Sequence, residues 1–446
     1  MTRLLILLTK IIYGICKLLG KNGSVYPGRV LFRRDIHALN KIKYPKYVIG
    51  VTGSSGKGST VNTIAGILKS NGYKVVYNES GSNAVRGIYT CIMRHTSVIT
   101  KKVQADVLLL ELDERHISLA FPICPLTHLV ITNITRDQPA RNAHPDVIFD
   151  VIMKSINEST ELIINADDPI VNEAKLIHKG KIVTYGIDEN KYQIKKNFLN
   201  CVDAAYCPVC HKKLVYKFYH YGHLGNYHCK NKCFARGKVN YNVTDLDLDK
   251  KRMKINDNLV CIDKNVFFAA YYTVAAYAVC SQIGLSNVDI INYLNNNTHE
   301  SKRMKEYNFN NRTITMIESK NENNLSYLQS LEYIKEQKGK KTIIIGFDNV
   351  SRRYKVNDLS WLYDVDFELL NDDSIDKIFC IGRFKYDVAC RLLIAGIDSK
   401  KLFLVDDVNN LLNDVKKYSK GSIYTMVCFD MTEVIRNLLR SENDEN

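Results

Sequence analysis

A glycine-rich loop that joins an apolar run to a helical pattern constrains the fold of this chain more than any other feature. Residues 47–52 (YVIGVT) predict a short buried strand, and the pattern from Ser59 to about Asn71 predicts a helix. Between them, Gly53 and Gly56 allow the backbone to curl so that its N–H groups face phosphate oxygens. The N-terminus of the following helix adds a favourable dipole. This strand–loop–helix unit predicts a phosphate-binding site.

The side chains of the loop supply the remaining parts of a nucleotide site. Lys57 places a positive charge near the β- and γ-phosphates, and the hydroxyl of Ser59 or Thr60 is a candidate Mg²⁺ ligand. Only two residues separate Gly53 from Gly56, so the spacing differs from the strict Walker pattern, and an ordinary Gly/Ser turn is the alternative. We expect ATP with Mg²⁺ to be bound by a set of loop residues: Thr52, Gly53, Gly56, Lys57, Gly58, Ser59 and Thr60.

Further apolar runs in the first half of the chain end in polar or charged residues. Apolar strands that alternate with helices indicate a parallel, doubly wound α/β sheet, in which ligands gather at the carboxyl ends of the strands. One run ends in Glu111, Asp113 and Glu114, which are either metal ligands beside the nucleotide or acids that solvate a surface turn. The runs cover residues 103–114, 127–134 and 161–168.

Four of the thirteen cysteines have the spacing of two metal-binding knuckles, with eighteen residues between the pairs. Each pair can hold two thiolates against one Zn²⁺, so the segment predicts a zinc ribbon. Redox chemistry is the alternative, and His223 and His228 are possible substitute ligands. The remaining cysteines follow no secreted disulfide framework, which favours a reduced, cytoplasmic protein. The predicted zinc ligands are Cys207, Cys210, Cys229 and Cys233.

The chain is long enough for more than one domain, and its residue composition and pattern change along its length. We expect an N-terminal amphipathic helix and lead-in over 1–46, then a central ATP-binding domain over 47–308. The zinc ribbon, at about 196–245, interrupts that domain. Strand–helix alternation then returns, which predicts a C-terminal α/β domain over 309–446.

The N-terminal segment repeats apolar residues at helical spacing with basic residues between them. Lys10 and Lys17 interrupt the apolar stretch, so it is too short to span a membrane. The helix either packs on its own domain or lies on a membrane surface, which leaves peripheral contact with the inner face of the membrane open. The formal net charge of +15 favours anionic partners such as nucleotides or acidic membranes. We do not expect nucleic acid as a partner.

Several segments carry a resemblance to a known family. The loop TGSSGKGST (52–60) resembles the TGxxGKxS/T loop of Mur ligases and folylpolyglutamate synthases. TNITRDQ (132–138), NADDP (165–169) and the DLSWLYDVDFE stretch (358–368) resemble segments of the MurT family, the synthetase subunits of MurT/GatD amidotransferases. The resemblance implies a Mur-ligase-like P-loop central domain that carries the inserted zinc ribbon, followed by the C-terminal α/β domain.

The same resemblance assigns roles to individual residues. It points to Ser59 as the first choice of Mg²⁺ ligand and to Glu111 as the acidic, catalytic metal ligand at the strand end. Asn133 and Arg303 are implied as nucleotide contacts. In the C-terminal domain, Asp358, or Asp364 as second choice, is implied to complete the Cys–His pair of a glutaminase that docks there; the alternative for both is a surface acid.

The implied function is an ATP-dependent ligase. ATP would phosphorylate the α-carboxylate of D-glutamate in a lipid-linked cell-wall precursor, and ammonia from a GatD-like glutaminase subunit would displace the phosphate. Departures from the family pattern at residues 320–324 and at Tyr272 leave the acceptor open between a muramyl and a pseudomurein type. The other hypotheses are an amino-acid ligase of the Mur or folylpolyglutamate type, and a non-catalytic ATP-binding scaffold or zinc-ribbon nucleic-acid binder.

Overall fold

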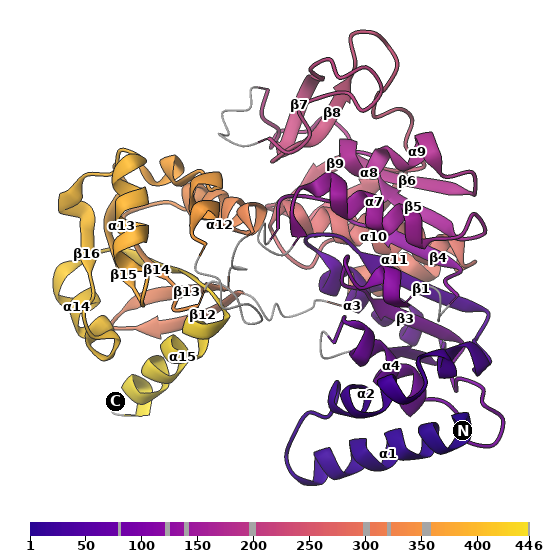
Figure 1. The fold of residues 1–446 in the computed structure, drawn as a ribbon. Coiled ribbons are helices and arrows are strands. Elements are labelled where there is room, and N and C mark those ends of the chain that lie inside the picture. The colour runs from indigo at the N-terminus through magenta and orange to yellow at the C-terminus, as the bar shows by residue number, and fades with distance from the viewer. Residues whose placement is uncertain are drawn as a thin grey trace. The chain divides into compact units, whose positions relative to one another are not determined.

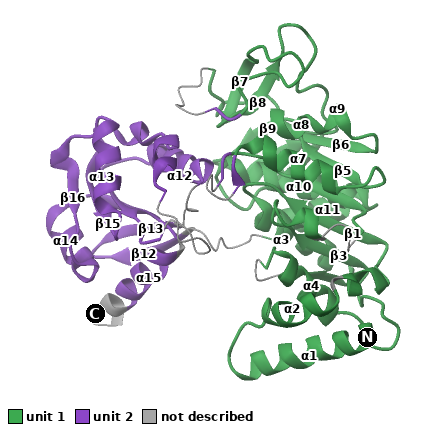
Figure 2. Ribbon diagram, in the orientation of Figure 1, with its two compact units in different colours: residues 1–135, 144–196, 204–298 green, residues 136–143, 197–203, 299–446 purple. Residues whose placement is uncertain are grey.

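The structure is a computed structural model, and it divides into two compact units (Figure 2). Unit 1 contains residues 1–135, 144–196 and 204–298, and unit 2 contains residues 136–143, 197–203 and 299–446. Two short segments of the first half of the chain therefore belong to the second unit. The residues that the structure describes are 1–78, 82–120, 125–137, 142–195, 202–297, 304–318, 323–349 and 358–444.

A nine-stranded sheet forms the centre of unit 1 (Figure 1). Its strand order is β11-β10-β9-β6-β5-β4-β1-β3-β2. The strands from β9 to β2 in this order run parallel, whereas β10 pairs antiparallel with both β9 and β11. The four strands expected in the first half of the chain are confirmed as β1, β3, β4 and β5. The strand bounds are β1 Tyr47–Thr52, β2 Val75–Tyr77, β3 Val107–Glu111, β4 His128–Ile131, β5 Glu161–Asn165, β6 Ile182–Ile187, β9 Tyr241–Asp247, β10 Arg252–Ile255 and β11 Asn258–Cys261.

Helices cover the sheet as two groups. Helix α3, which begins at the glycine-rich loop, contacts α10 and α11. Helices α4, α5, α7 and α8 form a second series of neighbours, and α1 and α2 pack against α4. The bounds are α1 Thr2–Leu18, α2 Tyr26–Leu31, α3 Lys57–Ser70, α4 Val85–Arg94, α5 Ile117–Ala120, α7 Pro145–Ser155, α8 Pro169–Asn172, α9 Ala174–Ile177, α10 Phe267–Gln282 and α11 Asn287–Asn296, with 3-10 helices η1 Phe32–Arg34 and η2 Ile36–Lys41.

The core of unit 1 follows from the alternation of side chains along buried strands. Val48, Leu108 and Leu129 belong to the hydrophobic cluster that also holds α4 and α7. Their neighbours Ile49 and Leu109 are equally buried and point to the opposite face. Both faces are covered, which explains why these strands are continuous apolar runs in the sequence.

The expected ribbon is confirmed as a two-stranded antiparallel hairpin outside the main sheet, made of β7 Val215–Tyr221 and β8 Leu224–His228 (Figure 1). It lies between β6 and β9 in the chain, yet those two strands pair directly. The hairpin is therefore an insertion that leaves the parallel sheet continuous.

Unit 2 is a second α/β body around a six-stranded sheet of order β12-β13-β17-β14-β15-β16. Strands β12 and β13 are antiparallel, and the remaining pairs are parallel. The sequence pattern predicted β14 to β17 but missed β12 and β13. The bounds are β12 Met304–Phe309, β13 Arg312–Glu318, α12 Asn324–Glu336, β14 Lys341–Gly346, η3 Ser360–Asp364, η4 Phe367–Leu370, β15 Ile375–Ile381, α13 Lys385–Ile394, η5 Ser399–Lys401, β16 Leu402–Leu404, η6 Val408–Asn410, α14 Leu411–Tyr418, β17 Ser422–Val427 and α15 Phe429–Asp444.

The two faces of this second sheet have separate cores, one under α12 and α13 and the other under α14 and α15. Trp361, the single tryptophan, is 2% exposed and packs against Tyr327 and Phe347 in the first of these cores. It is a core residue rather than a surface anchor. No helix among the described residues has the length and apolarity needed to cross a bilayer.

Helix α3 is held against α11 by a close approach at Gly66. A Cβ atom at Gly66 would lie 1.8 Å from the hydroxyl oxygen of Tyr293. We predict that Gly66→Ala destabilises unit 1 by about 1–3 kcal/mol, despite the higher helix propensity of alanine, because the buried tyrosine must move. Gly14→Ala in α1 is the matched control, since nothing lies within 4 Å of that site.

Thermal unfolding of the purified chain measures both effects. Gly14→Ala should leave the midpoint unchanged or raise it. In a Tyr293→Ala background the cost of Gly66→Ala should disappear, and a cost that persists there would contradict the close-approach explanation.

Candidate active site

The glycine-rich loop lies directly against the segment that follows β4. Gly53 has φ 129°, and a Cβ there would lie 2.3 Å from Thr132 Oγ1 and 2.7 Å from the carbonyl oxygen of Asn133. Gly56 has φ 80° and precedes the first residue of α3. Gly53 therefore requires glycine for both its space and its backbone conformation, and Gly56 requires it for its backbone conformation.

A set of hydrogen bonds braces this loop. Asn133 Oδ1 accepts from the Ser55 N–H at 3.0 Å, and Asn133 Nδ2 donates to the Ser55 carbonyl at 3.2 Å. Thr132 Oγ1 donates to the same carbonyl at 2.7 Å. Ser54 Oγ donates to the Thr135 carbonyl and accepts from its N–H. The amide of Asn133, expected to contact nucleotide, thus holds the loop in shape.

The two candidate Mg²⁺ hydroxyls differ in their surroundings. Thr60 is fully buried, and its hydroxyl donates to the Gly56 carbonyl at 3.0 Å, back along the helix. Ser59 is half-buried, and its hydroxyl has no hydrogen-bond partner within the described ranges. This difference favours Ser59 as the ligand.

Lys57 is paired within the site. Its ammonium lies 3.1 Å from Glu114 Oε2, and it also donates to the Gly53 carbonyl. The side chains of Lys57 and Glu114 are 9% and 2% exposed. Glu114 supplies the counter-charge that a buried ammonium requires.

Glu111 lies beside the first turn of α3. A Cβ at Gly58 would be 3.3 Å from Glu111 Oε2, and Glu111 Oε1 accepts from Asn83 Nδ2 at 3.2 Å. Asn78 fixes the backbone, because its side chain bonds both the N–H and the carbonyl of Glu111. The carboxylate is therefore held next to the loop, where a hard cation can bridge it to a phosphate.

The structure brings the predicted loop residues, Glu111 and Asn133 together at the carboxyl ends of the parallel strands. Asp113, also at this edge, accepts from the N–H of Arg115 at 3.2 Å, which orders the turn after β3. Arg303 lies outside the described residues. Asp358 and Asp364 belong to unit 2 and are separate from the loop in the chain.

The paired aspartates after β5 form a buried network that the sequence did not reveal. Asp167 accepts from Arg236 Nε at 2.5 Å, from Tyr271 Oη at 2.8 Å and from the Ile187 N–H at 2.8 Å. Burial, and then the charge of Asp167, raises the pKa of the Tyr271 hydroxyl well above its ordinary value. Tyr271 therefore stays a neutral donor.

The second aspartate, Asp168, connects three segments: the residues that follow β4, helix α8 and the cysteine ribbon. Asp168 accepts from the N–H of Ile134, just after β4, and from the first N–H groups of α8. It also lies 3.1 Å from Nε2 of His223, in the turn of the β7–β8 hairpin. His223, considered as a substitute zinc ligand, instead anchors the ribbon to the nine-stranded sheet.

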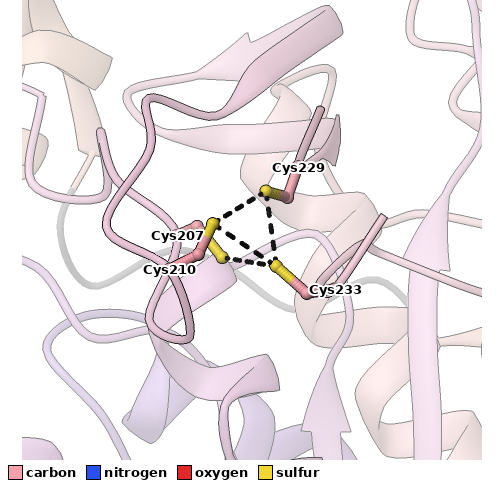
Figure 3. A group of neighbouring side chains, drawn as sticks. All are labelled: Cys207, Cys210, Cys229 and Cys233. Carbon is pink, nitrogen blue, oxygen red and sulfur yellow. Dashed lines mark hydrogen bonds between the residues drawn. The ribbon is translucent and has the colours of Figure 1, made fainter. Parts of the chain in front are cut away.

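The four cysteines converge at the far end of the hairpin (Figure 3). The measured sulfur–sulfur distances are 3.5 Å for Cys207–Cys233, 3.3 Å for Cys210–Cys229, and 3.5 Å from Cys233 to both Cys210 and Cys229. A tetrahedron of thiolates about 2.3 Å from a zinc ion has edges of about 3.8 Å. The donor set and its size therefore fit Zn²⁺.

Local backbone geometry supports thiolates at this cluster. The Val209 N–H donates to Cys207 Sγ at 3.4 Å, and His211 and Lys232 take positive φ in the two knuckle turns. A backbone hydrogen bond at Lys212 lowers the pKa of the Cys210 thiol to about 7, whereas burial raises the pKa values of the Cys229 and Cys233 thiols. A depressed thiol pKa favours the anionic form that binds metal.

Comparisons with known proteins agree with this architecture. Residues 51–237 match the Mur ligase middle domain, and residues 319–431 match the MurT ligase C-terminal domain. The subunit MurT of lipid II isoglutaminyl synthase (glutamine-hydrolyzing) from Staphylococcus aureus (strain N315) is 28% identical over 395 residues, 88% of this chain and 87% of that protein. The same subunit from Streptococcus pneumoniae is 25% identical over 425 residues, 94% and 93% of the two chains.

Solved structures share the fold. A pseudomurein peptide ligase type C from Methanothermus fervidus superposes with a TM-score of 0.68 at 21% identity, covering 91% of this chain and 81% of that one. MurF from Thermotoga maritima in complex with ADP gives a TM-score of 0.59 at 16% identity, covering 95% and 84%. The expected Mur-ligase-like fold is confirmed.

We predict that the purified chain carries about one zinc per molecule, measured by atomic emission. Cys210→Ser/Cys233→Ser should lose the metal and lower the thermal unfolding midpoint by several degrees, because the hairpin is tied to the buried Asp167–Asp168 network. Cys390→Ser, at an exposed cysteine outside the cluster, is the control and should change neither value. The zinc ribbon would be contradicted if wild-type protein without metal unfolded at the same temperature as wild-type protein with zinc.

Proposed function

Because the chain belongs to the MurT branch of the Mur ligases and is an ATP-dependent ligase, we propose that it amidates the α-carboxylate of D-glutamate in a lipid-linked cell-wall precursor. The relatives named as subunits of lipid II isoglutaminyl synthase support this choice of reaction. The match of the C-terminal unit to the MurT ligase C-terminal domain favours amidation over the addition of an amino acid.

One observation of the site carries the proposal. A rigid phosphate loop, a buried lysine and two carboxylates meet at one edge of a parallel sheet. Phosphoryl transfer needs few covalent contributions from a protein, but it needs fixed positive charge and backbone N–H groups around the phosphates. The brace from Asn133 and Thr132 supplies that rigidity before nucleotide arrives.

In the first proposed step, a carboxylate oxygen of the acceptor attacks the γ-phosphorus of ATP, and ADP leaves. The N–H groups of the loop and of the first turn of α3 would bind the phosphates, and Lys57 would turn from Glu114 toward them. Ser59 and Glu111 would hold Mg²⁺, which neutralises the charge that develops on the phosphate oxygens.

In the second step, neutral ammonia attacks the carbonyl carbon of the acyl phosphate, and inorganic phosphate leaves. A free carboxylate is a poor acceptor, and phosphorylation converts one of its oxygens into a good leaving group. The nitrogen now bound to the carbonyl carbon loses one proton, which phosphate or solvent accepts, and the amide results. The reaction uses a small nucleophile, so no second amino-acid pocket is required.

Ammonia would come from a GatD-like glutaminase bound to unit 2. Within unit 2, Asp364 already accepts from Arg136 Nη1 at 3.0 Å. Asp358 instead accepts from the N–H of Ser360 at 2.9 Å, at the start of η3, and that bond lowers the pKa of its carboxyl below its ordinary value. An ionised, half-buried Asp358 suits the third member of a Cys–His–Asp triad better than the paired Asp364.

We predict that Lys57→Ala reduces ammonia-dependent release of ADP by about 10²-fold or more, because a fixed charge at the phosphates is lost. Lys69→Ala, in the last turn of the same helix and exposed, is the matched control. The assay supplies ATP, Mg²⁺, ammonium chloride and lipid-linked precursors of muramyl and pseudomurein type. Turnover with an added amino acid but not with ammonia would support the amino-acid ligase, and full activity of Lys57→Ala would support a scaffold.

For the partner, we predict that Asp358→Asn lowers glutamine-dependent amidation by on the order of 10²-fold or more in the reconstituted complex. Amidation from added ammonium chloride should be unchanged, because the synthetase site is untouched. Asp364→Asn is the paired variant and should keep most of the glutamine-dependent rate. If Asp364→Asn lost more of the glutamine-dependent rate than Asp358→Asn, Asp364 would be the triad residue instead.

A further inference from the structure

Helix α1 leaves an apolar stripe uncovered. Its inner side packs on unit 1, where Leu5 and Ile6 join the main core. The outer apolar residues recur at spacings of three and four, which places them within an arc of about 80° at 100° per residue. These residues are 44% to 89% exposed: Leu4, Leu7, Ile11, Ile15 and Leu18.

The stripe residues are not part of the core of unit 1, which Leu5 and Ile6 join from the opposite side of the helix. Two further exposed apolar residues lie near the ends of the helix. Leu19 is 67% exposed just after the helix, and Ile99 is 78% exposed where its carbonyl accepts from Arg3 Nη2. A contiguous apolar surface of this kind marks a binding face.

The charge around the stripe is of one sign. Residues 1–34 contain seven basic residues and no acidic residue. Arg3, Lys10 and Lys17 lie along one flank of α1, between its buried side and the stripe, by the same helical geometry. The other four, exposed in the segment that follows, are Lys21, Arg29, Arg33 and Arg34.

Apolar residues beside a purely cationic border match the boundary between anionic headgroups and acyl chains. A protein partner would have to offer an apolar groove with an acidic rim along the whole helix. The 17 residues of α1 extend about 25 Å and carry three basic side chains, which suits a helix lying in the plane of a membrane surface.

We propose that α1 is an interfacial anchor that binds the surface of an anionic membrane through Leu7, Ile11 and Ile15, with Lys10 and Lys17 at the headgroups. The anchor does not depend on the proposed reaction. If the acceptor is lipid-linked, the anchor confines the ligase to the surface that holds it, which raises the effective concentration of the acceptor.

The test is co-sedimentation of the full chain with vesicles of phosphatidylglycerol and phosphatidylcholine in equal parts, and with phosphatidylcholine alone. We expect binding to the anionic vesicles that weakens with salt, and at least tenfold weaker binding to the neutral ones. Leu7→Gln/Ile11→Gln/Ile15→Gln should lose at least tenfold in binding. Lys10→Gln/Lys17→Gln should lose binding to anionic vesicles and much of the salt dependence.

Two readouts separate the anchor from folding and from catalysis. The triple variant should keep the wild-type unfolding midpoint and the wild-type ADP release with a water-soluble acceptor, because the altered side chains face outward. Leu393→Gln/Ile394→Gln, two exposed apolar residues on α13 in unit 2, is the matched control and should bind vesicles normally.

Several results would overturn the anchor. One is the absence of binding to anionic vesicles at low salt, and another is equal binding by the triple variant. If the wild type is a dimer and the triple variant a monomer by light scattering, with no vesicle binding by either, a second copy covers the stripe. If the triple variant loses only the glutaminase subunit, that subunit covers it.

Discussion

The contact between the glycine-rich loop and the segment after β4 is the constraint on which the rest of unit 1 depends. Gly53 must lack a side chain because Thr132 and the Asn133 backbone occupy that space, and Asn133 then bonds both sides of Ser55. The loop is therefore shaped by a neighbouring strand rather than by its own sequence alone. Since β1 and β4 are adjacent and parallel, this support exists only when the sheet has formed in its observed order.

The support continues outward from the loop. Asp168 accepts from the backbone N–H of Ile134, the residue after Asn133, and also contacts His223 in the cysteine hairpin. Asp167 accepts from Arg236, which follows soon after Cys233, the last cysteine of the four-cysteine cluster. The four cysteines thus lie on a hairpin whose turn and exit are both attached to the carboxyl edge of the nine-stranded sheet, so a zinc ion bound there would stabilise that attachment. This arrangement gives the ribbon a structural part in the ligase and explains why it can interrupt the domain without disturbing the sheet.

How much could be read from the sequence depended on how local each feature is. The loop, its strand and helix, and the four cysteines were predictable because their residues are close in the chain and their spacing reflects one geometry. The role of Asn133 was only partly predictable, since its partner Ser55 lies 78 residues away. The same holds for Arg236 and His223, which in the sequence resemble ordinary residues of a basic ribbon. Strands β9 to β13 were missed because polar residues interrupt their apolar ones, and antiparallel pairing joins β9 to β11 in one group and β12 to β13 in another, without the continuous apolar runs of the central parallel strands.

In the proposed reaction, the γ-phosphoryl group of ATP passes to the acceptor carboxylate at the braced loop before ammonia reacts. Isotope transfer tests it most directly. The acceptor is prepared with ¹⁸O in the α-carboxylate of its D-glutamate and converted with ATP and ammonia, and the released phosphate is analysed by mass spectrometry. An acyl phosphate requires one ¹⁸O atom to leave with each phosphate. Amide formation that releases phosphate without ¹⁸O would contradict the account.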